Sequence, residues 1–148
     1  MNINTAHRTS VSPVMSLDEL RAFMKREFPQ LGDAFEVMAV DEGSATMRLH
    51  ADEQHLRPGG TVSGPSLFAL ADVAAYAAIL AHIGPVALAV TTNLNINFLR
   101  KPSPGTVEAM ARLLKLGKRL AVLDISLTDG ASGELVAHAT ATYSIPPR

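Results

Sequence analysis

The chain has 148 residues, enough for one domain, and 47% of them are hydrophobic, which is ample for a buried core. A formal net charge of −1 argues against a nucleic-acid-binding surface and gives no reason to expect a membrane partner. The absence of cysteine excludes disulfides, a thiol nucleophile and thiolate metal ligands, and it fits a cytoplasmic location.

The N-terminal part of the sequence predicts a tail followed by a helix. Residues 1–15 are polar, lack the apolar segment of a secretory signal, and are expected to form a disordered tail. Residues 16–148 are predicted to form the single domain. Ser16 and Glu19 have the spacing of a capping box, and Pro29 is expected to end the helix that begins there.

Two strands and a second helix are predicted next. Residues 34–40 and 45–51 have the composition of strands and are split by the turn residues 41–43. A Pro/Gly-rich turn, residues 57–65, then leads into an apolar, alanine-rich run at residues 66–83. That run is long enough to raise the question of a transmembrane helix, but its composition favours a buried helix of a soluble protein.

The apolar helix has clear start and stop signals and contains one carboxylate. Ser63 or Gly64 is expected to cap it, Pro65 stands at a first-turn position, and Gly84 ends it. Asp72 lies inside the apolar run, and burying an unpaired carboxylate costs several kcal/mol or more. Asp72 is therefore either satisfied by local hydrogen bonds or used in chemistry.

Four segments in which apolar and polar residues alternate follow the helix, at residues 90–98, 107–113, 121–127 and 135–143. The turns between them are short enough to make consecutive strands antiparallel neighbours. One face of such a sheet must be covered, and only one helix is apolar all round. We therefore predict an α+β fold in which an antiparallel sheet curls around the long central helix.

Two segments of the sequence resemble the hotdog-fold acyl-CoA thioesterases, in particular the PaaI-like group of the phenylacetate pathway. One runs from Ser63 to Asp72 and reads Ser-Gly-Pro-Ser-Leu-Phe-Ala-Leu-Ala-Asp; the other, residues 97–102, reads Asn-Phe-Leu-Arg-Lys-Pro. The resemblance covers roughly residues 35–145, including the order of elements. It implies a hotdog fold, hydrolysis of an acyl-CoA thioester without a cofactor, and a homodimer or homotetramer.

The resemblance also implies three catalytic positions. Asp72 would be the nucleophile or general base, the Gly64 N–H would bind the thioester oxygen, and Thr91 would help to position the attacking water. Ser63 and Pro65 stand where the family usually has His and a second Gly. These departures leave open the alternative of a protein that binds an acyl-CoA or another small ligand without hydrolysing it.

The spacing of Gly64 and Asp72 carries a consequence of its own. Eight residues separate them, which corresponds to about 12 Å along a helix at 1.5 Å per residue. A carbonyl bound at Gly64 is then out of reach of Asp72 in the same chain. If both residues serve one substrate, the site must be shared between two subunits.

Further residues are candidates for contacts with substrate: Arg57, Ser63, Ser66, Tyr76, Arg100, Lys118 and Arg119. The cations could meet the phosphates of coenzyme A or could be ordinary solvated charges. Tyr76 could line a pocket for an aromatic or medium-length acyl group, or could belong to the core. Ser63 is a poor nucleophile because no His/Asp relay is visible beside it.

Other chemistries find less support in the sequence. The five histidines show no metal-ligand spacing, so no metal site is predicted, and no Gly-x-Ser-x-Gly motif points to a serine hydrolase. A hotdog hydratase is a second alternative, but it calls for an Asp/His pair, and no histidine follows Asp72 before His82. The identity of the acyl group is not encoded in any motif.

Overall fold

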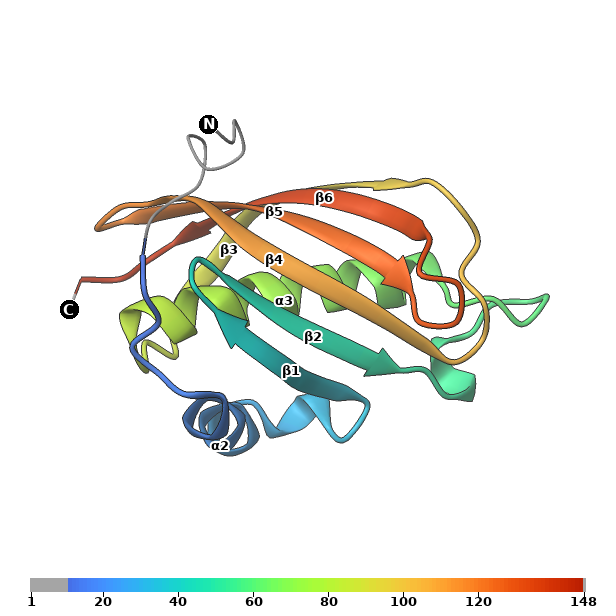
Figure 1. Ribbon diagram of the computed structural model, residues 1–148, viewed down its shortest axis with the longest axis horizontal. Coiled ribbons are helices and arrows are strands. Elements are labelled where there is room, and N and C mark those ends of the chain that lie inside the picture. Colours follow the sequence, from blue (N-terminus) through green and yellow to red (C-terminus); the bar gives the residue numbers. More distant parts are fainter. Residues whose placement is uncertain (1–10, 148) are drawn as a thin grey trace.

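The computed structural model describes residues 11–147, and its elements lie close to the predicted bounds (Figure 1). In chain order they are α2 (Leu17–Glu27), the 3-10 helix η1 (Pro29–Leu31), β1 (Phe35–Asp41), β2 (Ser44–His50), the 3-10 helix η2 (Glu53–His55), α3 (Gly64–Ile83), β3 (Val90–Phe98), β4 (Thr106–Leu116), β5 (Leu120–Asp129) and β6 (Leu135–Ser144). Residues 1–10 of the predicted tail lie outside the described residues. The backbone N–H groups of Val14 and Met15 donate to Ala81 O, at the end of α3.

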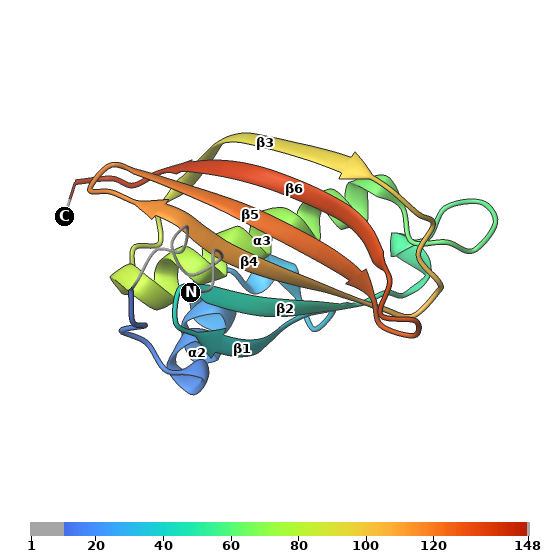
Figure 2. The same cartoon turned by 45° about the horizontal axis from the view of Figure 1, so that its top comes forward.

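The strands form one antiparallel sheet in the order β1-β2-β4-β5-β6-β3, and the sheet curls around α3 (Figures 1 and 2). This arrangement confirms the predicted α+β fold. The inward residues of the alternating strands are almost all fully buried, for example Ala109, Ala111, Ile125 and Ala139. Their partners on the other face point toward solvent, as the period of two requires.

One prediction about the sheet is wrong, because β3 and β4 are not neighbours. β4 lies between β2 and β5, whereas β3 pairs with β6 at the edge of the sheet. The connection of seven residues, 99–105, can span about 23 Å at about 3.3 Å per residue. Three spacings of about 4.8 Å between strands amount to only about 14 Å. A short link can therefore cross the ends of β5 and β6.

The central position of α3 follows from its composition. Thirteen of its residues are buried, and six of these are alanines with no exposed surface. The small side chains on the helix and on the inner face of the sheet allow close packing of the two layers. Within residues 11–147, α3 is the one helix long and apolar enough to span a membrane, but 78% of its most apolar 18-residue stretch is buried inside the fold. It is therefore a core helix.

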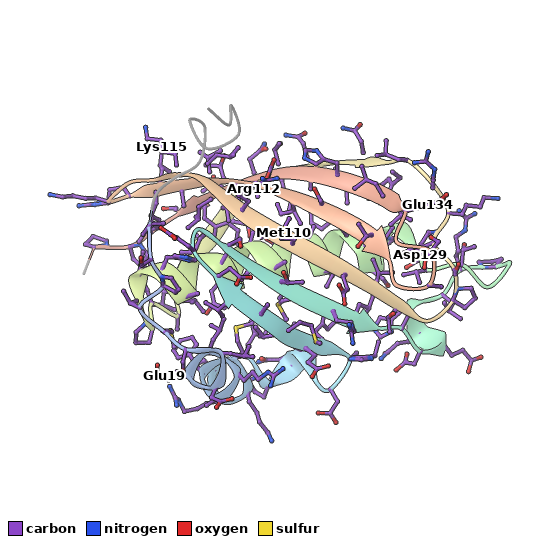
Figure 3. The ribbon with its side chains drawn as sticks, viewed as in Figure 1. Glu19, Met110, Arg112, Lys115, Asp129 and Glu134 are labelled. Carbon is purple, nitrogen blue, oxygen red and sulfur yellow. The ribbon has the colours of Figure 1, made fainter. Side chains whose placement is uncertain are left out.

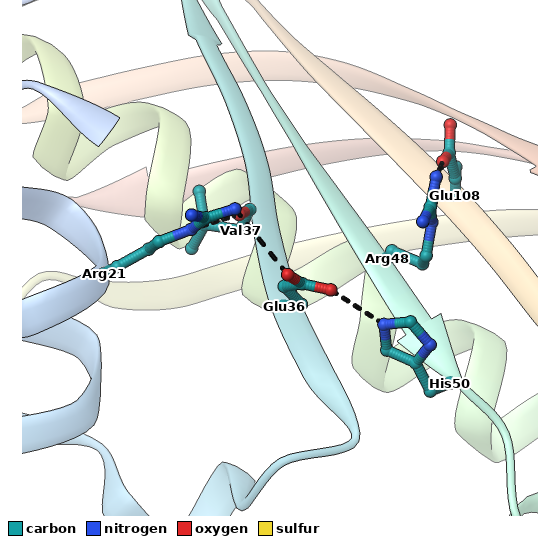
Figure 4. Close-up of polar contacts among 6 residues, drawn as sticks. All are labelled: Arg21, Glu36, Val37, Arg48, His50 and Glu108. Carbon is teal, nitrogen blue, oxygen red and sulfur yellow. Dashed lines mark hydrogen bonds and ion pairs between the residues drawn. The ribbon is translucent and has the colours of Figure 1, made fainter. Parts of the chain in front are cut away.

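Helix α2 is fixed against the outer edge of the sheet. The predicted capping box is present, with Ser16 Oγ accepting from Glu19 N and Glu19 Oε1 accepting from Ser16 N. Arg21 Nε donates to Val37 O on β1 at 2.8 Å and lies near Glu36, which in turn contacts His50 on β2 (Figure 4). This docking places Phe28, the residue after α2, against Tyr76 on α3.

Candidate active site

A bulge in β3 turns Thr91 toward the central helix. Strict alternation would place Thr91 on the outward face, with Asn93 and Asn95. In the structure the register shifts between Thr91 and Asn93, so that Thr91 pairs with Tyr143 while Leu94 pairs with Ala141. Directly opposite residues share a face of the sheet, and Tyr143 and Ala141 are both buried. The extra residue, Thr92, therefore moves Thr91 to the inner face.

Asp72 accepts two short hydrogen bonds from the sheet. Thr91 Oγ1 donates to Asp72 Oδ1 at 2.6 Å, and the Tyr143 hydroxyl lies 2.6 Å from the same oxygen and 2.9 Å from Asp72 O. Both donors act on Oδ1. Among the described residues no hydrogen bond reaches Oδ2, so that oxygen is free to act on a ligand or a water molecule.

Tyr143 is the part of this cluster that the sequence analysis did not identify. Its burial, followed by the negative charge of Asp72, raises its pKa far above that of an ordinary tyrosine. The phenol therefore stays protonated at neutral pH and donates to the carboxylate. A signal was present in the sequence, since Tyr143 is the one large residue on the inner face of a strand that otherwise presents Ala137, Ala139 and Ala141.

The Asp72 cluster opens into a cavity of about 510 Å³, which we call the Asp72 cavity. Besides Asp72, Thr91 and Tyr143 it is lined by Glu27, Phe28, Gln30, Val73, Tyr76, Ala87, Ala89 and Val90. Tyr76, predicted as a substrate contact, lines this cavity and donates its hydroxyl to Ala87 O at 2.9 Å. Burial and the nearby charge of Glu27 raise the pKa of Tyr76. The cavity thus combines two carboxylates, Asp72 and Glu27, with apolar and aromatic walls.

The first turn of α3 leaves one backbone donor free. Ser63 is the N-cap, and its Oγ accepts from Ser66 N at 3.3 Å and donates to Ser66 Oγ at 2.9 Å. Leu67 N donates to Ser63 O, and Pro65 has no N–H. Within residues 11–147, Gly64 N–H is therefore the donor of this turn without a partner, at the positive end of the helix dipole.

Gly64 faces a second cavity, of about 350 Å³, which we call the Gly64 cavity. Its lining includes two predicted substrate contacts, Arg57 and Arg100, together with Lys101 and Phe98. A Cβ atom on residue 64 would lie 3.3 Å from the Phe98 ring, so only glycine fits here without a shift of that ring. The predicted oxyanion donor and three cations therefore meet at this end of α3.

The predicted site residues are not all together within one chain. Asp72, Thr91 and Tyr76 line one cavity and Gly64, Arg57 and Arg100 line another, and the two share no lining residue. Arg100 lies beside Glu134, whereas Lys118 and Arg119 belong to the β4–β5 turn. Figure 3 places Glu134 at one end of the sheet and Lys115, next to that turn, at the other.

The histidines and carboxylates that the structure describes form no metal-binding cluster. No group of three or more His, Asp or Glu side chains that could hold a metal ion occurs within residues 11–147. His82, buried near the end of α3, is engaged instead by backbone groups: it accepts from Gly43 N at 2.9 Å and contacts Ala78 O at 2.7 Å. Its role there is to tie the β1–β2 turn to the helix.

A curled antiparallel sheet around one long apolar helix is the architecture of the hotdog class of protein. Comparison with known proteins agrees. Residues 59–136, more than half of the chain, match the family model described as the thioesterase superfamily. The chain belongs to the thioesterase superfamily.

Individual relatives lie in the same class. A crystal structure described as a “putative thioesterase” from Silicibacter sp. is 52% identical, with a TM-score of 0.87, and the match covers 94% of this chain and 97% of that one. A mutant of the phenylacetic acid degradation protein PaaI from Thermus thermophilus is 28% identical, with a TM-score of 0.67 over 84% and 99% of the two chains. The 1,4-dihydroxy-2-naphthoyl-CoA hydrolase of Listeria monocytogenes is 30% identical over 94 residues, covering 64% of this chain and 76% of that one.

Proposed function

We propose that this protein is a cytoplasmic acyl-CoA thioesterase whose active site is shared between two subunits. Membership of the thioesterase superfamily supports thioester hydrolysis in general, and the naphthoyl-CoA hydrolase among the relatives supports a coenzyme A thioester as substrate. The observation that carries the proposal is Asp72 in a cavity with apolar and aromatic walls, where one carboxylate oxygen is fixed by Thr91 and Tyr143 and the other is free.

In this proposal Asp72 attacks the thioester carbonyl or activates the water that does so. The two donors on Oδ1 orient the carboxylate, so that Oδ2 points its lone pairs at the reacting carbon or at water. Thr91 lies next to the same space, where its hydroxyl could also hold the water. The cavity walls are largely apolar and aromatic, so a second subunit that covers the open side would exclude bulk solvent and strengthen the electrostatic interactions inside.

The second subunit supplies the oxyanion donor through the free edge of β3. This nine-residue strand has an unpaired edge, and Val90 and Phe98 at its two ends are more than half exposed. The unpaired backbone N–H and C=O groups of such an edge can pair with a strand of another chain. Antiparallel pairing with β3 of a second copy about a two-fold axis at Leu94, the middle of the strand, would set Val90 of one chain opposite Phe98 of the other.

This pairing would complete two equivalent sites. Thr91, beside Asp72, lies at one end of β3, and Phe98, in contact range of Gly64, lies at the other. The two-fold axis therefore brings the Asp72 cavity of one subunit to the Gly64 cavity of its partner. The thioester oxygen would accept from Gly64 N–H, and Arg57, Arg100 and Lys101 would meet the phosphates of coenzyme A.

The test of the proposal is Asp72→Asn, assayed by thiol release over a panel of short, long and aromatic acyl-CoAs. The chain contains no cysteine, so the protein adds no background to the assay. We expect kcat to fall by about 10³-fold or more, because a nucleophile or base has been removed. Asp124→Asn, on β5, is the matched control and should keep its rate. Retention of most of the rate by Asp72→Asn would make Asp72 a structural residue.

The shared site has its own test in mixed dimers. Asp72→Asn is combined with Gly64→Pro, which lacks the N–H donor, after exchange of subunits. Half of the dimers in an equal mixture are mixed, and each mixed dimer has one site with both groups intact, so about a quarter of the parent activity should return. If exchanged, folded mixtures stay as inactive as the separate variants, each chain must contain a complete site.

The second candidate function is binding of an acyl-CoA without turnover. It is favoured by Pro65, which stands where the family has a second Gly and leaves α3 with a single free donor. Parent protein that binds acyl-CoA in calorimetry, yet releases no thiol from any member of the panel, would establish this function in place of hydrolysis.

A further inference from the structure

One aromatic residue separates the Asp72 cavity from a neighbouring groove. The groove lies between α2, η1 and β1, measures about 630 Å³, and is lined among others by Met24, Leu31, Phe35 and Val37. Among the residues that the structure describes, Phe28 is the only one that lines both spaces. Phe28 follows the last residue of α2, where it is held by its N–H donating to Met24 O at 2.8 Å.

Phe28 also belongs to a row of aromatic rings that ends at the carboxylate. Its ring meets Tyr76 edge-on, with 5.9 Å between centroids and an interplanar angle of 81°. Tyr76 lies 6.5 Å from Tyr143, and Tyr143 donates to Asp72. The ring of Phe28 is thus the far end of a wall that begins beside the reacting group, and its position depends on the docking of α2.

The groove behind Phe28 suits the distal part of an aliphatic chain. Its floor is formed by the buried side chains of Met24, Val37 and Met47, which continue into the core. Four charged residues line it: Arg21 and Glu36 are engaged with each other and with Val37 O, and Lys25 and Asp33 are exposed to solvent. An unbranched hydrocarbon entering past position 28 would therefore bury apolar surface without displacing a charge.

We propose that Phe28 is the end wall of the acyl pocket and sets the length of acyl chain that the protein accepts. The proposal rests on the proposed function, because it assigns the acyl group to the Asp72 cavity. With Phe28 in place, the acyl group ends at the ring. With the ring removed, the Asp72 cavity and the groove become one continuous space, and a longer chain extends between α2 and β1.

The experiment measures saturated acyl-CoAs from C4 to C14 in two ways. The first is kcat/KM from thiol release by Phe28→Ala, Phe28→Trp and the parent. The second is the Kd for the same ligands in calorimetry, with each substitution placed on an Asp72→Asn background so that nothing is turned over. Leu31→Ala, which shortens a side chain that lines the groove but not the Asp72 cavity, is the matched control.

Phe28→Ala should move the optimum to longer chains. Each methylene newly buried favours binding by a factor of about four, so two or more should change the C12-to-C6 ratio by at least about tenfold. Phe28→Trp should move the optimum to shorter chains, and Leu31→Ala should leave it unchanged. Melting temperatures near that of the parent show that the variants fold, and Phe28→Trp tests the proposal even if Phe28→Ala does not fold.

The two readouts separate failure of this proposal from failure of the proposed function. An unchanged length profile in both Phe28→Ala and Phe28→Trp would overturn the role of Phe28, whether or not the parent is active. Absence of thiol release by the parent would overturn the proposed hydrolysis alone. A shift in the Kd profile would still support Phe28 as the wall of an acyl-binding cavity.

Discussion

The single free donor at the start of α3 gives the sharpest prediction. Gly64→Pro removes that N–H at a position that suits proline, the first of a helix, and it also adds side-chain atoms beside the Phe98 ring. Ser63 already has φ −72° and ψ 154°, the extended conformation that precedes proline. Since Pro65 has no N–H and Ser66 N is bonded to Ser63 Oγ, no other donor in this turn can replace it. We expect kcat to fall by about 10²- to 10³-fold, the usual loss for one oxyanion donor.

The control for this prediction is Gly64→Ala. Alanine adds the same Cβ atom, 3.3 Å from the Phe98 ring, but keeps the N–H. Any loss caused by crowding appears in both variants, whereas loss of the donor appears only in Gly64→Pro. The assay is thiol release at saturating acyl-CoA, with melting temperatures to establish folding. If the two variants lose the same amount of activity, Gly64 N–H does not bind the oxyanion.

Three further predictions concern Tyr143, Arg57 and Asp129. Tyr143→Phe should lower kcat about tenfold or more. The pKa of Tyr143 is higher in the folded than in the unfolded state, so above a pH of about 10 only the unfolded parent loses the phenol proton. The parent should therefore lose more stability than Tyr143→Phe above that pH, as measured by denaturant titration. Arg57→Ala should raise KM by more than it lowers kcat, and the parent's KM should rise with salt more steeply than the variant's. Asp129 accepts hydrogen bonds from Ser103 N and Ala131 N, which lower its pKa. Asp129→Asn should therefore lower the free energy of unfolding by about 1–3 kcal/mol at pH 7. The difference from the parent should shrink as the pH falls below about 4, where the parent's carboxylate takes up its proton.

Local signals in the sequence were sufficient for the elements and for the central residue of the site. The spacing of Ser16 and Glu19 predicted a capping box that the structure contains, and Ser63 caps the helix that holds Asp72. A carboxylate in an otherwise apolar run is informative by itself, because its burial has to be compensated by partners. Those partners could not be read from Asp72, since both come from strands that are distant in sequence.

The sequence by itself determined that an apolar helix must be wrapped by a sheet, and that Gly64 and Asp72 lie too far apart along that helix to serve one carbonyl in one chain. Only the tertiary structure decided that β3 pairs with β6 at the edge of the sheet and not with β4. The loop between β3 and β4 is long enough either to connect neighbouring strands or to cross the ends of two others, so its length does not determine the pairing. The tertiary structure also decided that Thr91 faces Asp72. Alternation along β3 predicts that Thr91 lies on the outer face of the sheet. One extra residue in the pairing of β3 with β6 moves it to the inner face, and this bulge is visible only once the strand pairing is known.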